Sequence, residues 1–560
     1  MHSVHKNMKR RRIMRKRALA LILASALAAG MLAACGKSPQ SEASSAASAP
    51  QAPEAGEEVT VTYPLENPDD VTLSWWIPMA PPAAKHITNY SEAEAYAEFS
   101  NCTNVNVEFI HPVSGQEKEQ LGVLLAGGDL PDLIMIRNWY NGGSSAGVDD
   151  GVFMDLTDLV PIYAPDYYKA ITSSELAYRL ATNSEGRITE FNLIKSSAPA
   201  FNRIVWNKSV LEKYGYTDGA APETVDEYTE LFKKMAADGL PGFSPTSNGQ
   251  VVQFMYPFGI TSGFFLGEDG SIRYGQATEE YRDYLTLMNQ WYEAGYLYKD
   301  FMTNMTQTEL QALFNNQQVG MMIGSADQAR AQAATVGVDV VKANYPRIKK
   351  GDPMHFETTS WEQLPILGGQ TTVISADCEN PELALEYMNY YYTQEGCDLQ
   401  SFGIEGKSYV VAEDGTKQYT DYMLNNPDIP IGDVGNILKA NACPGLREAD
   451  INCFPDYLTD PDILAFRMQY SDDPTVDDSQ VLPAFQMSME ASTERSKIMR
   501  DITTYIDEMT LKFITGAEPL ENFDAYLEQL DKMGMQDAID ITASEYEVFL
   551  TKPVPEWITE

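Results

Sequence analysis

The feature that most constrains the fold of this chain is an alternation of strand-like and helix-like segments near its start. Short runs of β-branched and aromatic residues alternate with helical patterns, and the first run stops at Pro78. A β-α-β-α-β order predicts an α/β fold in which helices cover a mostly parallel sheet. The expected strands are residues 71–77, 105–110 and 131–136, and the expected helices are residues 91–99 and 116–126.

The same kind of pattern continues through the rest of the 560-residue chain. The roughly 500 residues after position 58 exceed what one hydrophobic core normally serves, so at least two lobes are expected. Further strands are predicted at residues 203–207, 271–274, 320–324 and 371–375, and further helices at residues 209–214, 224–237, 278–294, 381–393, 497–515 and 522–533.

The first 58 residues have the composition of an export and tethering segment. Seven of residues 9–17 are Lys or Arg, and an apolar run follows at 18–30. That run is too short to span a bilayer as a helix and fits a signal peptide. Leu32-Ala33-Ala34-Cys35 then resembles the bacterial lipobox, which implies that Cys35 carries a diacylglycerol anchor. Residues 1–34 are therefore predicted as a lipoprotein signal peptide and residues 35–58 as a flexible tether on the extracellular side of the membrane.

The charge of the chain argues against a nucleic-acid partner. The sequence has 80 acidic and 40 basic residues, and the eight basic residues before Cys35 leave with the signal peptide. The mature chain then has 32 basic residues and a formal charge near −48. No basic stripe remains for a phosphate backbone, so we expect no nucleic acid.

The cysteine spacing predicts no metal site, because no Cys-x-x-Cys pair occurs among the 6 cysteines. Cys443 and Cys453 are close enough in sequence to form a disulfide that clips a loop, and buried free thiols are the alternative. We expect neither a metal nor a cofactor.

Catalytic signatures are weak. Residues 143–147 match the Gly-x-Ser-x-Gly spacing, but a nucleophile elbow requires a strand directly before the serine and a helix directly after it, and the sequence predicts neither. We therefore expect no enzyme activity. With 80 acidic residues, a hidden carboxylate pair is not excluded, so a surface enzyme acting on polysaccharide stays open as an alternative.

Several segments, taken in their order along the chain, resemble the bacterial extracellular solute-binding proteins of family 1, in the maltose-binding-like superfamily. The resemblance is strongest to the large lipoprotein type of this family. The resemblance spans residues 71–409, and each segment alone is weak. The segments are Pro131-Asp132-Leu133, Gly151-Val152-Phe153-Met154-Asp155-Leu156-Thr157, Trp206-Asn207-Lys208-Ser209, Pro222-Glu223-Thr224-Val225-Asp226-Glu227, Asp269-Gly270-Ser271-Ile272-Arg273-Tyr274-Gly275 and Gly403-Ile404-Glu405-Gly406-Lys407-Ser408-Tyr409.

This resemblance implies a two-lobed, type II periplasmic-binding-protein-like fold whose lobes join through a multi-segment hinge and close around a ligand. Lobe 1 would comprise residues 59–196 plus 358–405, and lobe 2 residues 200–350 plus 410–560. The implied partners are a small-molecule ligand and the permease subunits of an ABC importer, with the protein acting as a monomer.

A carbohydrate ligand, and within that class an oligosaccharide, is expected from the 31 Tyr and 7 Trp residues, because aromatic rings stack on sugar faces. Peptides and other solutes remain alternatives. Aromatic and polar residues at predicted strand ends are the site candidates, and two further candidates come only from the resemblance. The strand-end and loop candidates are Trp76, Arg137, Asn138, Trp139, Phe265 and Trp361, and those implied by the resemblance are Glu405 and Tyr409.

Overall fold

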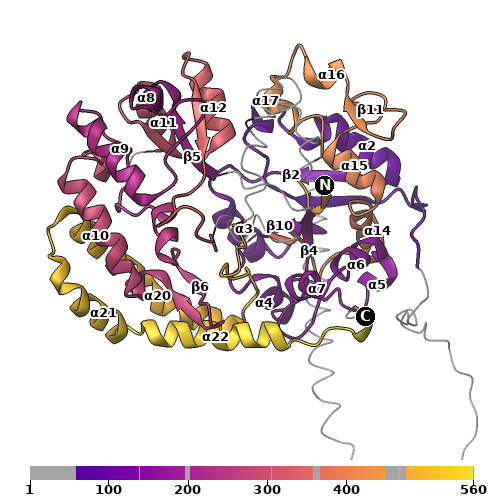
Figure 1. Cartoon of the computed structure of the whole chain (residues 1–560). Helices are drawn as coiled ribbons and strands as arrows, with labels where there is room; N and C mark the ends of the chain where they lie inside the picture. The colour runs from indigo at the N-terminus through magenta and orange to yellow at the C-terminus, as the bar shows by residue number, and fades with distance from the viewer. Residues whose placement is uncertain are drawn as a thin grey trace, which may run out of the picture. The chain divides into compact units, whose positions relative to one another are not determined.

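The computed structural model describes residues 59–137, 139–195, 202–303, 306–356, 366–440, 442–447, 466 and 475–558. Two separate hydrophobic cores form within these ranges, each built around its own sheet. The chain therefore has the two-lobed α/β architecture that the sequence predicts, with a long C-terminal helical region added (Figure 1).

The first lobe contains a six-stranded sheet in the order β13-β4-β10-β3-β1-β2. Strand β1 pairs in parallel with both β2 and β3, as the alternation predicts. The sheet is mostly parallel, as predicted: β13 also pairs in parallel with β4, and β10 is the one strand that runs antiparallel to its neighbours β3 and β4 among the described residues. Strand β10 enters the sheet after the chain has built the second lobe. The strands are β1 (Thr72–Trp76), β2 (Asn106–Ile110), β3 (Leu133–Met135), β4 (Phe191–Lys195), β10 (Ile366–Ile374) and β13 (Gly445–Arg447).

Side chains of β1 alternate between the two faces of this sheet. Trp75 is fully buried in the main core of the first lobe, whereas Trp76 lies in a smaller cluster with Ile134 and Phe153. Asp132 fixes the register at the head of β3, since its Oδ2 accepts hydrogen bonds from the Ser74 amide (2.8 Å) and hydroxyl (2.7 Å). The Pro-Asp-Leu segment is therefore a strand-pairing device.

Helices pack around the first sheet, and several begin at caps that the sequence encodes. Ser174, for example, accepts a hydrogen bond from the Ala177 amide at the start of α7. The helices are α2 (Glu94–Thr103), α3 (Glu117–Gly127), α4 (Gly143–Asp149), α5 (Val160–Tyr163), α6 (Pro165–Ile171), α7 (Glu175–Ala181), α14 (Pro381–Tyr390) and α15 (Gln394–Ser401).

The predicted assignment of residues 410–560 to the second lobe is wrong for its first part. Tyr419, Met423 and Leu438 are buried in the core of the first lobe, and β13 joins its sheet. The reason is packing at long range, which local patterns do not encode. This region holds β11 (Tyr409–Val411), β12 (Lys417–Tyr419), α16 (Asp421–Leu424) and α17 (Ile431–Val434).

The second lobe has an antiparallel sheet in the order β8-β5-β9 and a hairpin of β6 and β7. Trp206 of β5 and Trp291 of α10 are fully buried in its core. Helix α9 begins with a capping box in which Thr224 and Glu227 bond reciprocally, which explains the Thr-x-x-Glu spacing. The strands are β5 (Asn202–Asn207), β6 (Phe264–Leu266), β7 (Ile272–Tyr274), β8 (Met321–Ser325) and β9 (Val340–Ala343), and the helices are α8 (Lys208–Lys213), α9 (Val225–Ala237), α10 (Glu280–Glu293), α11 (Gln307–Asn315), α12 (Ala326–Ala334), α20 (Met489–Thr515), α21 (Phe523–Lys532) and α22 (Met535–Thr551).

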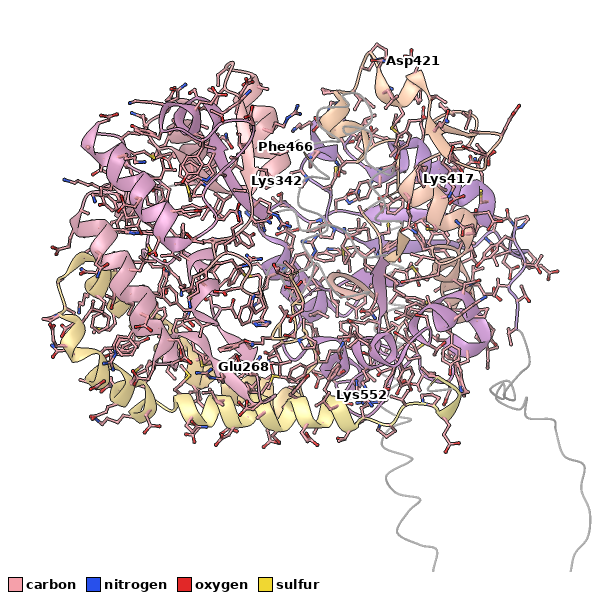
Figure 2. All side chains as sticks on the ribbon, in the orientation of Figure 1. Glu268, Lys342, Lys417, Asp421, Phe466 and Lys552 are labelled. Atoms are coloured by element: carbon pink, nitrogen blue, oxygen red, sulfur yellow. The ribbon has the colours of Figure 1, made fainter. Side chains whose placement is uncertain are left out.

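Helix α22 connects the two cores. Met535 at its start is buried in the second core, and Phe549 near its end is buried in the first. Lys552 follows this helix and is labelled at its end in Figure 2; its ammonium donates to the carbonyl oxygens of Arg179 (2.7 Å) and Thr182 (2.6 Å). The C-terminal helix is thus tied to α7 of the first lobe.

Candidate functional site

A cavity of about 720 Å³ opens beside the carboxyl end of β3 in the first lobe. Its walls come from the loop after β3, the start of α4, the segments before β4 and within β10, and the segment that leads into α20 of the second lobe. The lining residues with side chains suited to ligand contact are Lys118, Arg137, Trp139, Tyr140, Asn141, Ser144, Glu190, Thr371, Gln486 and Ser492.

Trp139 is the aromatic platform of this cavity. Its ring is partly exposed and stands edge-on to Trp76, with centroids 5.9 Å apart and an interplanar angle of 88°. Trp76 itself is 3% exposed, so it supports Trp139 from beneath rather than facing a ligand. An edge-to-face pair of this kind contributes about 0.5–1.5 kcal/mol beyond the buried area, which holds the Trp139 ring in place.

Arg137 lies on the rim beside this ring. Its guanidinium carbon is 5.3 Å from the centroid of the Trp139 ring. The backbone of Arg137 has φ of +43°, the left-handed region, and the Trp139 amide donates to the Ile136 carbonyl (2.9 Å) in the same tight turn. Left-handed backbone at a non-glycine residue is unfavourable and clusters at functional sites.

Glu190 forms part of the opposite wall and is 6% exposed. Gln486 Nε2 donates a hydrogen bond to Glu190 Oε1 (3.3 Å), and Ser145 Oγ donates to Gln486 Oε1 (3.4 Å). Burial raises the pKa of Glu190 to about 7, although hydrogen bonding by Ser144 and Thr371 opposes that rise. Near neutral pH a large fraction of this carboxyl is protonated.

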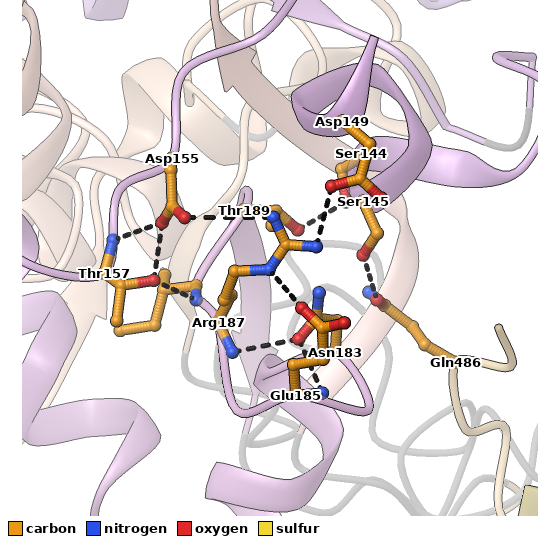
Figure 3. A network of polar contacts seen from close by, with 11 residues as sticks. Ser144, Ser145, Asp149, Asp155, Thr157, Asn183, Glu185, Arg187, Thr189 and Gln486 are labelled. Atoms are coloured by element: carbon orange, nitrogen blue, oxygen red, sulfur yellow. Dashed lines mark hydrogen bonds and ion pairs between the residues drawn. The ribbon is translucent and has the colours of Figure 1, made fainter. Parts of the chain in front are cut away.

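A polar network joins α4 to the loop of residues 183–190 (Figure 3). Arg187 is its centre: the guanidinium pairs with Asp149 (2.9 Å) and Glu185 (3.0 Å) and lies 3.9 Å from Asp155. The hydroxyls of Ser144 and Thr189 are 2.7 Å apart, next to Glu190. This network fixes the wall of the cavity.

The Gly-x-Ser-x-Gly segment belongs to this wall and is not a nucleophile elbow. Residues 143–149 form helix α4, which includes two positions expected in a loop, and residues 137–142 separate it from β3. Ser144 is buried against Thr189. Gly147 lets Phe153 approach, since a Cβ at this position would lie 2.1 Å from the Phe153 ring. The spacing therefore serves packing.

A second cavity, of about 600 Å³, lies in the second lobe. Asn248 Nδ2 donates to Asp507 Oδ1 (2.9 Å), and Thr246 Oγ1 donates to the Gln250 carbonyl (2.6 Å) at its wall. Its lining, as far as the described residues form it, contains amides and hydroxyls but neither an aromatic ring nor a cation. The polar lining residues are Asn202, Ser244, Thr246, Ser247, Asn248, Gln250, Gln253, Ser262 and Asp507.

Of the residues predicted from sequence, Arg137 and Trp139 line the first-lobe cavity. Phe265 is fully buried in the second core, and Tyr409 is 3% exposed beside Phe402, so neither ring offers a face to a ligand. Glu405 is exposed in the loop before β11 and does not line this cavity. These three positions differ from the prediction because aromatic and polar patterns at strand ends are also used for packing and turns.

Three predicted positions, Cys35, Asn138 and Trp361, lie outside the described residues, as do Cys453 and residues 35–58. Cys443 is buried, with its Sγ 3.9 Å from the Tyr96 hydroxyl, so the disulfide with Cys453 stays a prediction.

Sequence reasoning missed Lys118, Glu190 and Gln486. Lys118 lies in the first turn of α3, and Gln486 is nearly 300 residues from Glu190 along the chain. A lysine in the first turn opposes the helix dipole and was the one local signal available for these residues. Glu190 precedes β4 with no motif around it.

Within the described ranges, no helix is long and apolar enough to cross a membrane. The same part of the chain contains no group of three or more His, Cys, Asp or Glu side chains that could hold a metal ion.

The two-lobed architecture with a cavity at the carboxyl end of a sheet strand defines the class of type II solute-binding proteins. A solved extracellular solute-binding protein from Bifidobacterium longum subsp. infantis has the same fold, with a TM-score of 0.68 at 16% identity over 87% of this chain and 100% of that chain. Residues 84–396 match the family described as bacterial extracellular solute-binding protein. The chain belongs to this family, whose members act outside the cytoplasm.

Two curated relatives extend over most of the chain. The Polygalacturonan/rhamnogalacturonan-binding protein YtcQ of Bacillus subtilis is 22% identical over 81% of this chain and 87% of its own length. The Fructooligosaccharide ABC transporter substrate-binding protein FusA of Streptococcus pneumoniae is 22% identical over 87% of this chain and 92% of its own length. Both are binding proteins by name, and neither name describes an enzyme.

Proposed function

We propose that this protein is the substrate-binding component of an ABC importer, that it captures an oligosaccharide between its two lobes, and that it performs no chemistry on it. The observation that carries the proposal is the partly exposed Trp139 ring in a 720 Å³ cavity surrounded by hydrogen-bonding side chains. A sugar offers apolar ring faces and hydroxyl groups, and this arrangement supplies a flat partner for the first and donors and acceptors for the second. The carbohydrate ligands named for both relatives support the same class of ligand.

Capture would involve a hinge motion. The first cavity is lined by Gln486, which precedes α20, and by Ser492 in the first turns of α20, a helix whose Ile502 and Phe513 are buried in the second core. A ligand in this cavity therefore touches residues connected to both lobes, and closure would bring the second cavity toward it. The closed form would then be the one that docks on the permease.

The attachment of the protein to the membrane is inferred from the sequence. A thioether-linked diacylglycerol on Cys35 supplies two acyl chains, enough for stable attachment to the membrane. Residues 36–58 would span from that anchor to the first lobe. A Cys35→Ala variant should move from the membrane fraction to the medium with unchanged ligand affinity.

The full chain, purified in detergent, tests the proposal by calorimetry and thermal melting against neutral oligosaccharides, oligogalacturonides and peptides of matched length. Binding by at least one saccharide class should raise the melting temperature, and ligand should reduce the radius of gyration in solution scattering. Chromatography of the same samples should recover the saccharide intact. Stabilisation by peptides alone would contradict the carbohydrate assignment, and shortened products would favour the enzyme alternative.

A further inference from the structure

The charge lining the first-lobe cavity is opposite to the charge of the rest of the chain. The sequence has 80 acidic and 40 basic residues, yet among the residues that the structure describes the charged side chains lining this cavity are two cations, Lys118 and Arg137, and one acid, Glu190. We propose that the cavity selects saccharides that carry a carboxylate, with Arg137 and Lys118 pairing with that carboxylate while Trp139 carries the sugar ring. This inference rests on the proposed function and specifies its ligand class.

Both cations are available for a ligand. Neither Arg137 nor Lys118 forms an ion pair or a side-chain hydrogen bond within the described residues, and the stacking of Arg137 on Trp139 is its recorded interaction. Other arginines of the first lobe behave differently, since Arg187 pairs with three carboxylates and Arg179 with Glu175. A guanidinium held beside a ring and lacking a protein carboxylate presents its donor fork to a ligand carboxylate.

Each of the two cations occupies a position where its local surroundings are unfavourable for it. Arg137 has left-handed backbone, and Lys118 occupies the first turn of α3, where the helix dipole disfavours a positive charge. Glycine would adopt the backbone of position 137 without steric cost, and an acid or a neutral residue would suit the helix dipole better at position 118. A role in binding an anion accounts for both departures.

The carboxyl of Glu190 does not neutralise the positive charge of Arg137 and Lys118. It is nearly fully buried, no cation in the described part of the chain pairs with it, and it accepts a hydrogen bond from Gln486. Because burial raises its pKa to about 7, much of the carboxyl is neutral at the pH of the cell surface. A neutral carboxyl in the wall can donate its proton to an acceptor oxygen of the ligand instead of repelling it.

The test compares two ligands that differ only at C6 of each sugar, where one carries a carboxylate and the other a neutral hydroxymethyl group. Calorimetry on the full chain in detergent would use tetragalacturonate and the tetragalactose obtained by reducing its carboxyl groups. Salt titration alone is a poor test, because salt screens the long-range repulsion from the acidic protein as well as the local attraction. We expect the native protein to prefer the acidic tetramer by about 10- to 100-fold, the range of charge-assisted hydrogen bonds.

Variants then show which side chains cause the preference for the acidic tetramer. Arg137→Gln should reduce the preference for the acidic tetramer about 10-fold, with little change for the neutral tetramer, and Lys118→Gln should reduce it about 3-fold. Arg137→Lys, which keeps the charge but loses the planar fork, should fall between Arg137→Gln and the native protein. Lys299→Gln removes an exposed cation that does not line this cavity and is the matched control.

The outcomes separate this inference from the proposed function. Equal affinity for the two tetramers, or an acid preference that survives in the Arg137→Gln, Lys118→Gln double variant, overturns the carboxylate inference while the protein remains a saccharide receptor. Failure of every saccharide, neutral or acidic, to bind the native chain overturns both. A melting temperature within a few degrees of the native value shows that each variant is folded.

Discussion

The cavities of the two lobes differ in the chemistry they offer. The first-lobe cavity combines an aromatic platform, two cations and a buried acid, whereas the second-lobe cavity presents amides and hydroxyls with one acid, Asp507. The first is suited to stacking and charge, and the second to hydrogen bonding with hydroxyl groups. The difference indicates that each lobe would recognise a different part of a saccharide, so that full affinity requires both.

The two cavities also differ in how their polar groups are occupied. In the second lobe, Asn248 bonds to Asp507 and Thr246 bonds to the Gln250 carbonyl, so these groups are already oriented by one another. In the first lobe, Arg137 and Lys118 have no such partner within the described residues. Removal of a side chain should therefore alter ligand discrimination in the first lobe and general affinity in the second.

The largest expected effect concerns the buried acid. Glu190 has a pKa of about 7 in the folded protein against 4.5 as its ordinary value. As pH rises from 4.5 to 7, the unfolded chain loses this proton first, so stability falls and stays lower above pH 7. The 2.5-unit difference corresponds to about 3 kcal/mol at 1.36 kcal/mol per unit. Glu190→Gln should therefore be more stable than the native protein at pH 8, by up to about 3 kcal/mol, and nearly equal to it at pH 4.

Denaturant unfolding at pH 4, 6 and 8 measures this difference. Glu405→Gln removes an exposed acid of the same lobe and is the matched control for the loss of one carboxyl group. Parallel stability curves for Glu190→Gln and the native protein would show that Glu190 is ionised like an exposed carboxyl, and the contrast between the two cavities would then be reduced to the aromatic ring and the cations.

The next effect is the loss of the aromatic platform. Trp139→Ala should weaken binding of acidic and neutral saccharides alike by about 30- to 100-fold, the loss typical of a central aromatic contact. Calorimetry with the saccharide panel measures it, and Trp557→Ala, at a tryptophan that is 49% exposed on the C-terminal segment, is the control. If Trp139→Ala lowers the affinity less than variants of the second-lobe cavity do, then the second cavity contributes more to binding than the first, contrary to the proposal.

A smaller effect is expected in the second lobe. Asn248→Ala removes the amide that donates to Asp507 and should weaken binding of both tetramers about 3- to 10-fold, equivalent to one hydrogen bond. The ratio of the two affinities should stay at its native value. A change in that ratio would show that the second cavity also discriminates between charged and neutral ligands.

The smallest expected effect is a change in folding stability when Arg137, at the rim of the first-lobe cavity, is replaced. Arg137→Gly should stabilise the folded protein by about 1 kcal/mol, because glycine adopts positive φ without steric cost. The same variant should weaken binding of the acidic tetramer. Asp218→Gly, at another left-handed position with φ of +57°, should stabilise to a similar extent and leave binding unchanged. Destabilisation of the Arg137→Gly variant would show that the guanidinium contributes to folding instead.

Much of the fold was predictable because its signals are local. The alternation of Trp75 and Trp76 across the sheet, the cap at Asn207 and the capping box at Thr224 all depend on residues a few positions apart. Arg137 and Trp139 were predictable as site candidates because ligands bind beyond the carboxyl ends of sheet strands. The assignment of residues 410–447 and the burial of Phe265 and Tyr409 depend on contacts between distant segments, which no local pattern encodes.

The amino-acid sequence by itself determined the class of this protein: its strands, its helix caps and the order of its motifs are set by short-range periodicity and hydrogen bonding. The tertiary structure alone decided the composition of the cavity, since Lys118, Trp139, Glu190, Thr371 and Gln486 come from five separate stretches of the chain. It also decided that Trp76 is buried while the ring of Trp139, which stands edge-on to it, stays partly exposed. The physical reason is that burial, and with it the raised pKa of Glu190, depends on which distant residues exclude water from a side chain.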